Sequence, residues 1–230
     1  MQETDEKRVS VIIPSYNRYD LLRHSVQSVI DGTHKNIEVI IVNDCSTDPR
    51  YYDGSLEKME RTKVVHLPQN SRNKYKLAAA QGAVRQVGVE SATGDFVAFL
   101  DDDDFFLPNK IEAQLAAMAR HDVEFSCTNA WNIEHDSAGT ELSFKVKGEY
   151  YKFKMPELFG RDFLEVHNLI CTSSVIMSRA LIERVGPMKA EIYEDWKFWL
   201  RALEQTARCL YLDEPLVLYS LNTEKLYLYE

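Results

Sequence analysis

Short apolar runs alternate with segments of helical periodicity over the first half of the chain, and this alternation limits the available folds. Residues 9–14, VSVIIP, have the length and β-branched composition of a strand that is buried on both faces. Similar runs occupy residues 37–44, 63–68, 95–100 and 123–131, and segments of helical spacing occupy residues 19–32, 76–94 and 108–121. Because such units pair their strands in parallel, we predict an α/β fold with a mostly parallel central sheet flanked by helices.

The second half of the chain is less regular. Residues 132–160 are polar, aromatic and without clear period, which indicates an inserted hairpin or loop. A strand at residues 170–178 and helices at residues 179–186 and 193–206 are predicted to follow. We therefore expect residues 1–230 to form a single domain with two halves, at about residues 9–131 and 132–230.

Composition narrows the class of protein. The apolar content of 45% is enough for a large core, and the net charge of -9 argues against nucleic acid as a partner. The four cysteines are far apart and form no CxxC pair, which favours reduced thiols. Neither a signal peptide nor an apolar run long enough to span a membrane is evident. We expect a cytoplasmic protein, either on its own, peripheral to a membrane or part of a longer polypeptide. The oligomeric state stays open.

Four consecutive aspartates, Asp101 to Asp104, follow the apolar run at residues 95–100. A solvated acidic loop would be the ordinary explanation. However, the carboxyl ends of parallel strands meet at one edge of a sheet, where ligands bind. The polar segments PSYNR and NDCSTD follow two other predicted strands and are expected at the same edge. Carboxylates at i and i+2, such as Asp101 and Asp103, suit a hard divalent cation.

Four segments together resemble the successive signatures of the family two inverting glycosyltransferases. They are VSVIIPSYNR, IEVIIVNDCSTD, GAVRQVGVESATGDFVAFLDDDD and YEDWKFWLRA, in this order over about residues 9–203. The resemblance implies the GT-A fold, in which a nucleotide-sugar-binding half is joined to a smaller acceptor-side half. It also implies transfer of a sugar from a nucleotide-diphosphate sugar to an acceptor hydroxyl, in polysaccharide or glycan synthesis. The expected donor is a UDP-sugar, with a dTDP-sugar as the alternative, the acceptor a carbohydrate or glycan, and the cofactor Mn²⁺ or Mg²⁺.

The resemblance also assigns roles to individual residues. Asp195 would be the catalytic base, with Glu194 beside it. Asp103 would ligate the metal directly, and Asp101, the other member of the DXD motif, would ligate it from nearer the ribose. The residues that would bind the nucleotide sugar are Pro14, Ser15, Tyr16, Asn17, Asp44, Arg85, Asp101 and Asp102. Among these, the Tyr16 ring would stack on the base and Asp44 would accept the imide N–H of uracil or thymine.

Each assignment has a structural alternative. Tyr16 could be a core aromatic at a strand end, and Arg85 a surface residue of a helix. Asp44 could cap a turn, and Asp195 could simply favour a helix N-terminus.

Among the histidines, His167 is a further candidate site residue, because it precedes the predicted strand at residues 170–178 and could face the acceptor.

Two segments depart from the family pattern. The loop QNSRNKYKLAAAQ is longer and poorer in glycine than the family's turn. Many relatives carry a histidine near the metal in a C-terminal YR.H motif, where this chain has Ser220 and Asn222 in LYSLN. Two rival functions therefore stay open. One is a nucleotidyltransferase, although the glycine-rich loop that it needs is missing after the first strand. The other is a sugar-nucleotide-binding module without activity.

Overall fold

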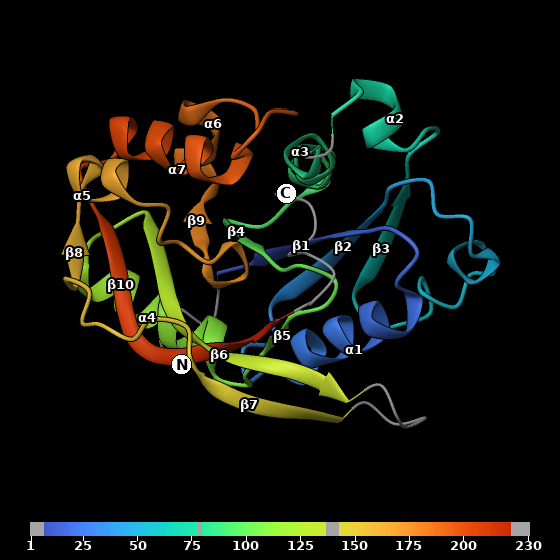
Figure 1. Cartoon of the computed structure of the whole chain (residues 1–230), viewed down its shortest axis with the longest axis horizontal. Coiled ribbons are helices and arrows are strands. Elements are labelled where there is room, and N and C mark those ends of the chain that lie inside the picture. Colours follow the sequence, from blue (N-terminus) through green and yellow to red (C-terminus); the bar gives the residue numbers. More distant parts are fainter. Residues whose placement is uncertain (1–6, 78–79, 137–142, 222–230) are drawn as a thin grey trace.

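The first strand, β1 (Val9–Ser15), lies near the centre of the sheet in a computed structural model of the chain, which describes residues 7–77, 80–136 and 143–221. It pairs in parallel with β2 (Ile37–Asn43) on one side and β4 (Phe96–Phe99) on the other, and β2 pairs in parallel with β3 (Thr62–His66). The predicted parallel α/β core is therefore confirmed for this half of the chain (Figure 1).

Beyond β4 the sheet becomes mixed, with the strand order β3-β2-β1-β4-β9-β6-β10-β5. The long strands β6 (Phe125–Asp136) and β10 (Cys209–Ser220) are parallel, whereas β9 (Ile176–Ser178) runs antiparallel to both β4 and β6. Three further strands run antiparallel to a neighbour: β5 (Phe105–Phe106), β7 (Ser143–Glu149) and β8 (Leu158–Phe159). The sheet is thus parallel from β3 to β4 and mixed beyond β4.

Helices cover both faces of the sheet, as Figure 1 shows. The helices with their bounds are α1 (Tyr19–Ile30), α2 (Ser71–Tyr75), α3 (Gln81–Ser91), α4 (Lys110–His121), α5 (Arg161–Val166), α6 (Arg179–Val185) and α7 (Glu194–Gln205). Short 3₁₀ turns lie at η2 (Pro49–Tyr52) and η3 (Thr172–Ser174).

The alternation of side chains along each strand divides the core in two. In β1, Val11 and Ile13 belong to the cluster that includes α1 and α4, whereas Ile12 belongs to the cluster that includes α3, α6 and α7. Successive side chains of a strand point to opposite faces, so a strand between two helical layers must be apolar throughout. This explains the uninterrupted apolar runs of the sequence.

Some predicted boundaries are wrong. Residues 170–178 do not form one strand, because the η3 turn interrupts the segment and only β9 pairs in the sheet. The hydroxyls of this segment bind groups outside a strand ladder, for example from Ser174 to the Cys171 carbonyl. The helix predicted at residues 76–94 is observed as α3, which begins at Gln81, and α4 begins at Lys110, not at Pro108. The irregular segment after residue 131 contains the predicted hairpin, formed by β6 and β7. In the described parts of the chain, none of the helices has the length and apolar character needed to cross a bilayer.

Candidate active site

The three predicted polar segments meet at one edge of the sheet. Ser15 at the end of β1 is in register with Asn43 at the end of β2, and the Asp44 N–H donates to the Ser15 carbonyl at 2.9 Å. The Ser15 hydroxyl in turn donates to Asp102, at 2.7 Å, from the segment that follows β4. The strand order changes direction between β1 and β4, and such a switch point is where an open α/β sheet forms its ligand crevice.

The acidic run is not a solvated loop. Asp103 and Asp104 are fully buried, Asp102 is nearly so, and Asp101 is half-buried. Asp104 accepts hydrogen bonds from the Ser173 hydroxyl at 2.5 Å and from the Ser220 N–H at 2.8 Å. These partners come from distant parts of the chain, so the tertiary structure holds the run in place.

Three carboxylates of the run could share a cation. One oxygen each from Asp101, Asp103 and Asp104 lie within 4.8 Å of one another. Hard divalent ions take oxygen ligands of this kind, and burial makes uncompensated like charges costly. The residues therefore fit a Mg²⁺ or Mn²⁺ ion, with Asp104 joining the two ligands that the sequence predicted.

Arg18 is one of two arginine side chains that form ion pairs with the acidic run in the described structure. It follows PSYN in the sequence, and its guanidinium donates to Asp102 at 3.1 Å and to Asp103 at 2.9 Å. Burial alone would lower the pKa of Arg18, but these carboxylates outweigh it and raise the pKa above its usual value. Asp102 responds mainly to its own burial, which raises its pKa to about 6 against the opposing charge of Arg18.

Arg85 joins the acidic run to the candidate catalytic helix. Its side chain is almost completely buried and donates to Asp101 at 2.5 Å and to Glu194 at 3.2 Å. Burial opposes the charge of Arg85, but Asp101 and Glu194 prevail and raise its pKa. Burial also raises the pKa of Glu194, and Arg85 limits that rise. Arg85 is thus not a surface residue. Its nucleotide contact stays a prediction, as does the supporting role of Glu194.

Asp195 lies in the first turn of α7 and is half-buried. One of its carboxylate oxygens accepts the Trp196 N–H at 2.7 Å, and the other accepts the Thr172 hydroxyl at 2.9 Å. The helix is fixed by the buried side chains of Phe198 and Trp199. Tyr193 is the N-cap residue, and Asp195 lies in the first turn, where an acidic side chain also favours the helix N-terminus. The role of Asp195 as the base therefore stays a prediction beside that alternative.

The predicted base-binding residues lie at the ends of β1 and β2. Tyr16 is 41% exposed, which rules out a core role and leaves its ring free to stack. Asp44 is buried, and its carboxylate accepts the N–H and hydroxyl of Ser71, each at 2.7 Å, and the Asn70 amide at 3.1 Å. Burial raises the pKa of Asp44, while the bonds from Ser71 oppose that rise. A carboxylate has about four lone-pair sites, so these bonds leave capacity for a further donor.

Two other predicted residues have structural partners. Asn17 has a φ of 52° and accepts the Thr47 N–H at 2.8 Å, so it links the loops that follow β1 and β2. Pro14 belongs to β1 and is paired with Val42 of β2. Direct contacts of Pro14, Ser15 and Asn17 with a nucleotide sugar stay predictions.

The C-terminal strand reaches the acidic run through Ser220. Its hydroxyl donates to the Asp103 carbonyl, and His135 Nε2 lies 2.7 Å from the same hydroxyl. His135 thus stands one side chain away from the acidic run. Asn222 lies outside the described residues. His167 is exposed just after α5, and an acceptor contact stays a prediction for it.

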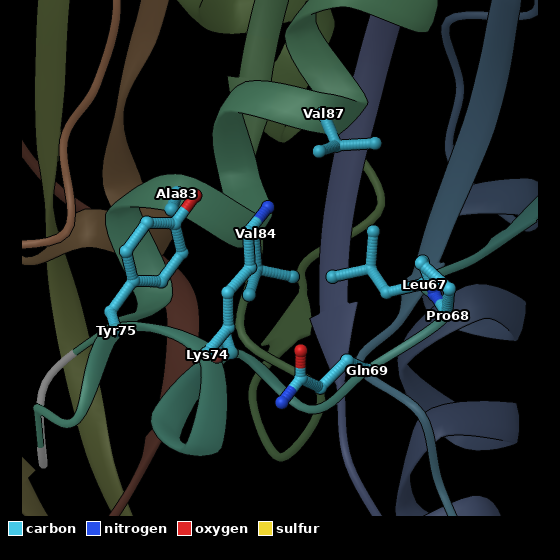
Figure 2. Close-up of a pocket in the computed structure, with 9 residues that line it drawn as sticks. Leu67, Pro68, Gln69, Lys74, Tyr75, Ala83, Val84 and Val87 are labelled. Carbon is cyan, nitrogen blue, oxygen red and sulfur yellow. The ribbon is translucent and has the colours of Figure 1, made fainter.

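An apolar pocket of about 120 Å³ lies beside this edge. Figure 2 shows Val84 and Val87 of α3 facing Leu67 across it. Ser71, which donates to Asp44, also contributes to its wall. None of the predicted site residues lines this pocket.

Comparison with known proteins identifies the family. The model of Glycosyl transferase family 2 matches residues 10–185. The chain belongs to this family. It is 33% identical over 215 residues to the putative teichuronic acid biosynthesis glycosyltransferase TuaG of Bacillus subtilis, covering 93% of this chain and 79% of TuaG. It is also 31% identical over 197 residues to the UDP-Glc:alpha-D-GlcNAc-diphosphoundecaprenol beta-1,3-glucosyltransferase WfaP of Escherichia coli, covering 86% of this chain and 70% of WfaP.

Solved structures confirm the GT-A glycosyltransferase fold. The crystal structure of S. aureus TarS 1-349 aligns with a TM-score of 0.71 at 22% identity, over 93% of this family 2 chain and 60% of that chain. In a second crystal structure, of S. aureus TarS, the aligned residues make up 38% of the TarS chain. Similarly, it spans 26% of an uncharacterized glycosyltransferase of Rickettsia bellii to which it is 34% identical over 195 residues. Several relatives are thus much longer than this chain.

Sequence reasoning missed the residues that hold the site together. Arg18 is visible in PSYNR, and an arginine at the same sheet edge as the acidic segments NDCSTD and DDDD could be expected to pair with one of them. Thr172 and Ser173 were assigned to a strand, which concealed their contacts with Asp195 and Asp104. His135 had no sequence signal that separated it from the other histidines.

Proposed function

We propose that this family 2 glycosyltransferase moves a sugar from a UDP-sugar to a hydroxyl of a carbohydrate or glycan acceptor, with inversion and with a bound Mn²⁺ or Mg²⁺. The observation that supports it most is the fixed placement of Asp195. Arg85 and the η3 turn connect the Asp195 segment with the acidic run. A base and a site for a diphosphate leaving group are thus parts of one rigid network.

Donor binding follows from the strand ends. The exposed Tyr16 ring would stack on the uracil, and Asp44, already oriented by Ser71, would accept the imide N–H. TarS has been crystallised in complex with UDP-GlcNAc and with UDP, and the name of WfaP gives UDP-Glc as its donor. These names favour UDP over dTDP for this chain.

The divalent ion would be held by Asp101, Asp103 and Asp104, where it would offset the charge of the diphosphate as a Lewis acid. Arg18 and Arg85 orient the carboxylates around it.

The chemical step is a single displacement. The acceptor oxygen forms a bond to the anomeric carbon while the bond from that carbon to the diphosphate oxygen breaks, and the UDP leaves with the electron pair. Asp195 takes the proton of the acceptor hydroxyl as general base. Attack from the face opposite to the leaving group inverts the anomeric centre.

The names of the relatives place them in glycan assembly, since TuaG is named for teichuronic acid and WfaP for a GlcNAc-diphosphoundecaprenol acceptor. We infer a role in polysaccharide synthesis for this chain. A cytoplasmic location stays a prediction.

The first experiment is a screen of UDP- and dTDP-sugars for hydrolysis with Mn²⁺, with Mg²⁺ and with EDTA. The wild type should hydrolyse at least one UDP-sugar only when a metal is present, and Asp195→Asn should lower the rate about a hundred- to ten-thousandfold, as is typical for loss of a general base. Its affinity for UDP should stay unchanged. Asp162→Asn, at an exposed aspartate in the first turn of α5, is the matched control.

Three outcomes would contradict the proposal. Near-normal turnover in Asp195→Asn would place the base elsewhere, with Glu194 the next candidate. Equal rates of hydrolysis in EDTA and in Mn²⁺ would contradict the proposed metal dependence. Tight UDP binding without hydrolysis of any sugar would favour the inactive binding module.

A further inference from the structure

The η3 turn contacts both the candidate base and the acidic run. The Thr172 hydroxyl donates to Asp195 at 2.9 Å. The next residue, Ser173, donates to Asp104 at 2.5 Å and accepts the Asp101 N–H at 3.0 Å. Two consecutive hydroxyls therefore point to the two parts of the site. Their spacing is set by a single peptide unit, which is planar and rigid.

The turn is itself anchored. Thr172 is 8% exposed, Ser173 1% and Ser174 fully buried. The Ser174 carbonyl accepts the side chain of Gln114, a fully buried residue of α4, at 3.0 Å, and the Ser174 hydroxyl donates to the Cys171 carbonyl at 2.7 Å. A hydroxyl on such a turn has a defined position relative to the sheet. Such a hydroxyl can therefore position a side chain that bonds to it from another element.

Asp195 needs such a hydroxyl. The bond from the Trp196 N–H to one carboxylate oxygen is local to the helix, because donor and acceptor are neighbouring residues. It does not tie the carboxylate to the acidic run. The bond from Thr172 comes from another element, 23 residues away in sequence. Of these two hydrogen bonds, only the one from Thr172 ties the carboxylate to the turn that also contacts the acidic run.

The chemistry of the pair agrees with this geometry. A hydroxyl that donates to one carboxylate oxygen fixes the direction in which that carboxylate points. Threonine is β-branched, so its χ1 angle is more restricted than that of serine and its hydroxyl loses less freedom when it bonds. Each oxygen of Asp195 can accept a second hydrogen bond, so the contact does not block an acceptor hydroxyl.

We propose that Thr172 is a positioning residue for the transfer reaction. Its hydroxyl holds the Asp195 carboxylate at a fixed distance from the acidic run, and this inference rests on the proposed role of Asp195 as the base. Thr172 does not take part in the bond changes. Its removal leaves the donor site intact and misplaces the base.

The test compares Thr172→Val, which keeps the shape and removes the hydroxyl, with Thr172→Ser, which keeps the hydroxyl. The matched control is Thr128→Val. Thr128 is buried like Thr172, and its hydroxyl also donates one hydrogen bond, to the Asn129 carbonyl at 2.8 Å. That bond lies outside the site, so its loss tests only the general effect of removing a buried hydroxyl. Each variant is measured for UDP affinity in Mn²⁺ and for hydrolysis of the UDP-sugar that the wild type turns over fastest.

We expect Thr172→Val to lower kcat roughly ten- to a hundredfold, as is typical when the partner that orients a reacting group is lost, with unchanged UDP affinity. Thr172→Ser should keep most of the rate, and Thr128→Val all of it. In an Asp195→Asn background, Thr172→Val should cause no further loss, because its effect passes through that carboxylate.

Several results would overturn the proposal. One is a Thr172→Val enzyme with normal kcat, and another is a further loss in the Asp195→Asn background. A Thr172→Ser enzyme as slow as Thr172→Val would make the methyl group, and not the hydroxyl, the important part. Equal losses of rate and of UDP affinity would indicate general damage to the site.

The proposed function can fail separately. If Asp195→Asn retains turnover, the base assignment is wrong whatever Thr172 does. If no UDP-sugar is hydrolysed, a crystal structure of Thr172→Val with UDP and Mn²⁺ decides the positioning role. A displaced or mobile Asp195 carboxylate supports it, and an unmoved carboxylate contradicts it.

Discussion

Replacing Arg85 with methionine should destabilise the protein more than any surface charge change. The Arg85 side chain is 5% exposed and lies between Asp101 and Glu194, whose side chains are 24% and 11% exposed. Methionine keeps much of the length and apolar volume but removes the cation. Two carboxylates would then face the same buried position without the charge that compensates them.

The expected size follows from this burial. Removing one partner of a buried ion pair costs about 3–5 kcal/mol of unfolding free energy. For a chain of this size, each kcal/mol shifts the Tm by about 2–4 °C, so Arg85→Met should lower the Tm by roughly 6–20 °C. Adding Glu194→Gln should recover part of the loss, because one orphaned charge is removed. Arg184→Met, at the exposed pair with Glu124, should change the Tm little.

Thermal unfolding in EDTA and in Mn²⁺ measures these effects and also tests the metal proposal. If Asp101 ligates the ion, Mn²⁺ should raise the Tm of Arg85→Met more than that of the wild type, since the ion replaces part of the missing positive charge. The reasoning is refuted if Arg85→Met melts within about 2 °C of the wild type in EDTA. It is also refuted if Arg85→Met with Glu194→Gln is no more stable than Arg85→Met alone.

Three further predictions concern other parts of the fold. Burial lowers the pKa of Lys110 from 10.5 to about 7, so the unfolded chain binds more protons between these values and the unfolding free energy should rise with pH across that window. Urea unfolding of Lys110→Met should lack this rise, and an equal slope in both proteins would contradict the pKa shift. Tyr16→Ala should weaken UDP binding by calorimetry about ten- to a hundredfold, through loss of base stacking, and an unchanged isotherm would remove Tyr16 from the base site. Gly82→Ala would bring a Cβ against the Lys189 carbonyl and within 2.7 Å of Glu194 Cγ, so the loop at Lys189 and the Glu194 side chain must shift. Both Tm and hydrolysis should fall, and a normal Tm would contradict the tight packing at Gly82.

Much of the fold could be predicted because local pattern and tertiary packing agree there. The strands β1, β2 and β4 are buried on both faces, so their sequences are apolar without interruption. The same agreement placed Tyr16, Asp44 and Asp101 at one edge, since parallel strands share the direction of their carboxyl ends.

The η3 turn could not be predicted, because its conformation depends on distant partners. ICTSSVIMS has the composition of a strand, yet the hydroxyls of Thr172 and Ser173 bind Asp195 and Asp104. The energy of those bonds is not visible in a local window of sequence. The mixed order of the second half is similar, since β9 is only three residues long and its direction is set by pairing with β4 and β6.

The charges at the sheet edge connect donor binding with the metal. In the described part of the chain, Arg18 pairs with Asp102 and Asp103, and Arg85 pairs with Asp101 and Glu194. Two more carboxylates at this edge accept hydrogen bonds from uncharged hydroxyls, Asp104 from Ser173 and Asp195 from Thr172. A nucleotide diphosphate that entered this region alone would add further negative charge to a partly buried acidic site. The structure already shows the cost in the raised pKa of Asp102, which burial causes and Arg18 only limits. A divalent ion would remove the repulsion for the donor, and the donor oxygens would in turn complete the shell of the ion. Since such coupling is reciprocal, the affinity for UDP should rise with Mn²⁺ by the same factor as the affinity for Mn²⁺ rises with UDP.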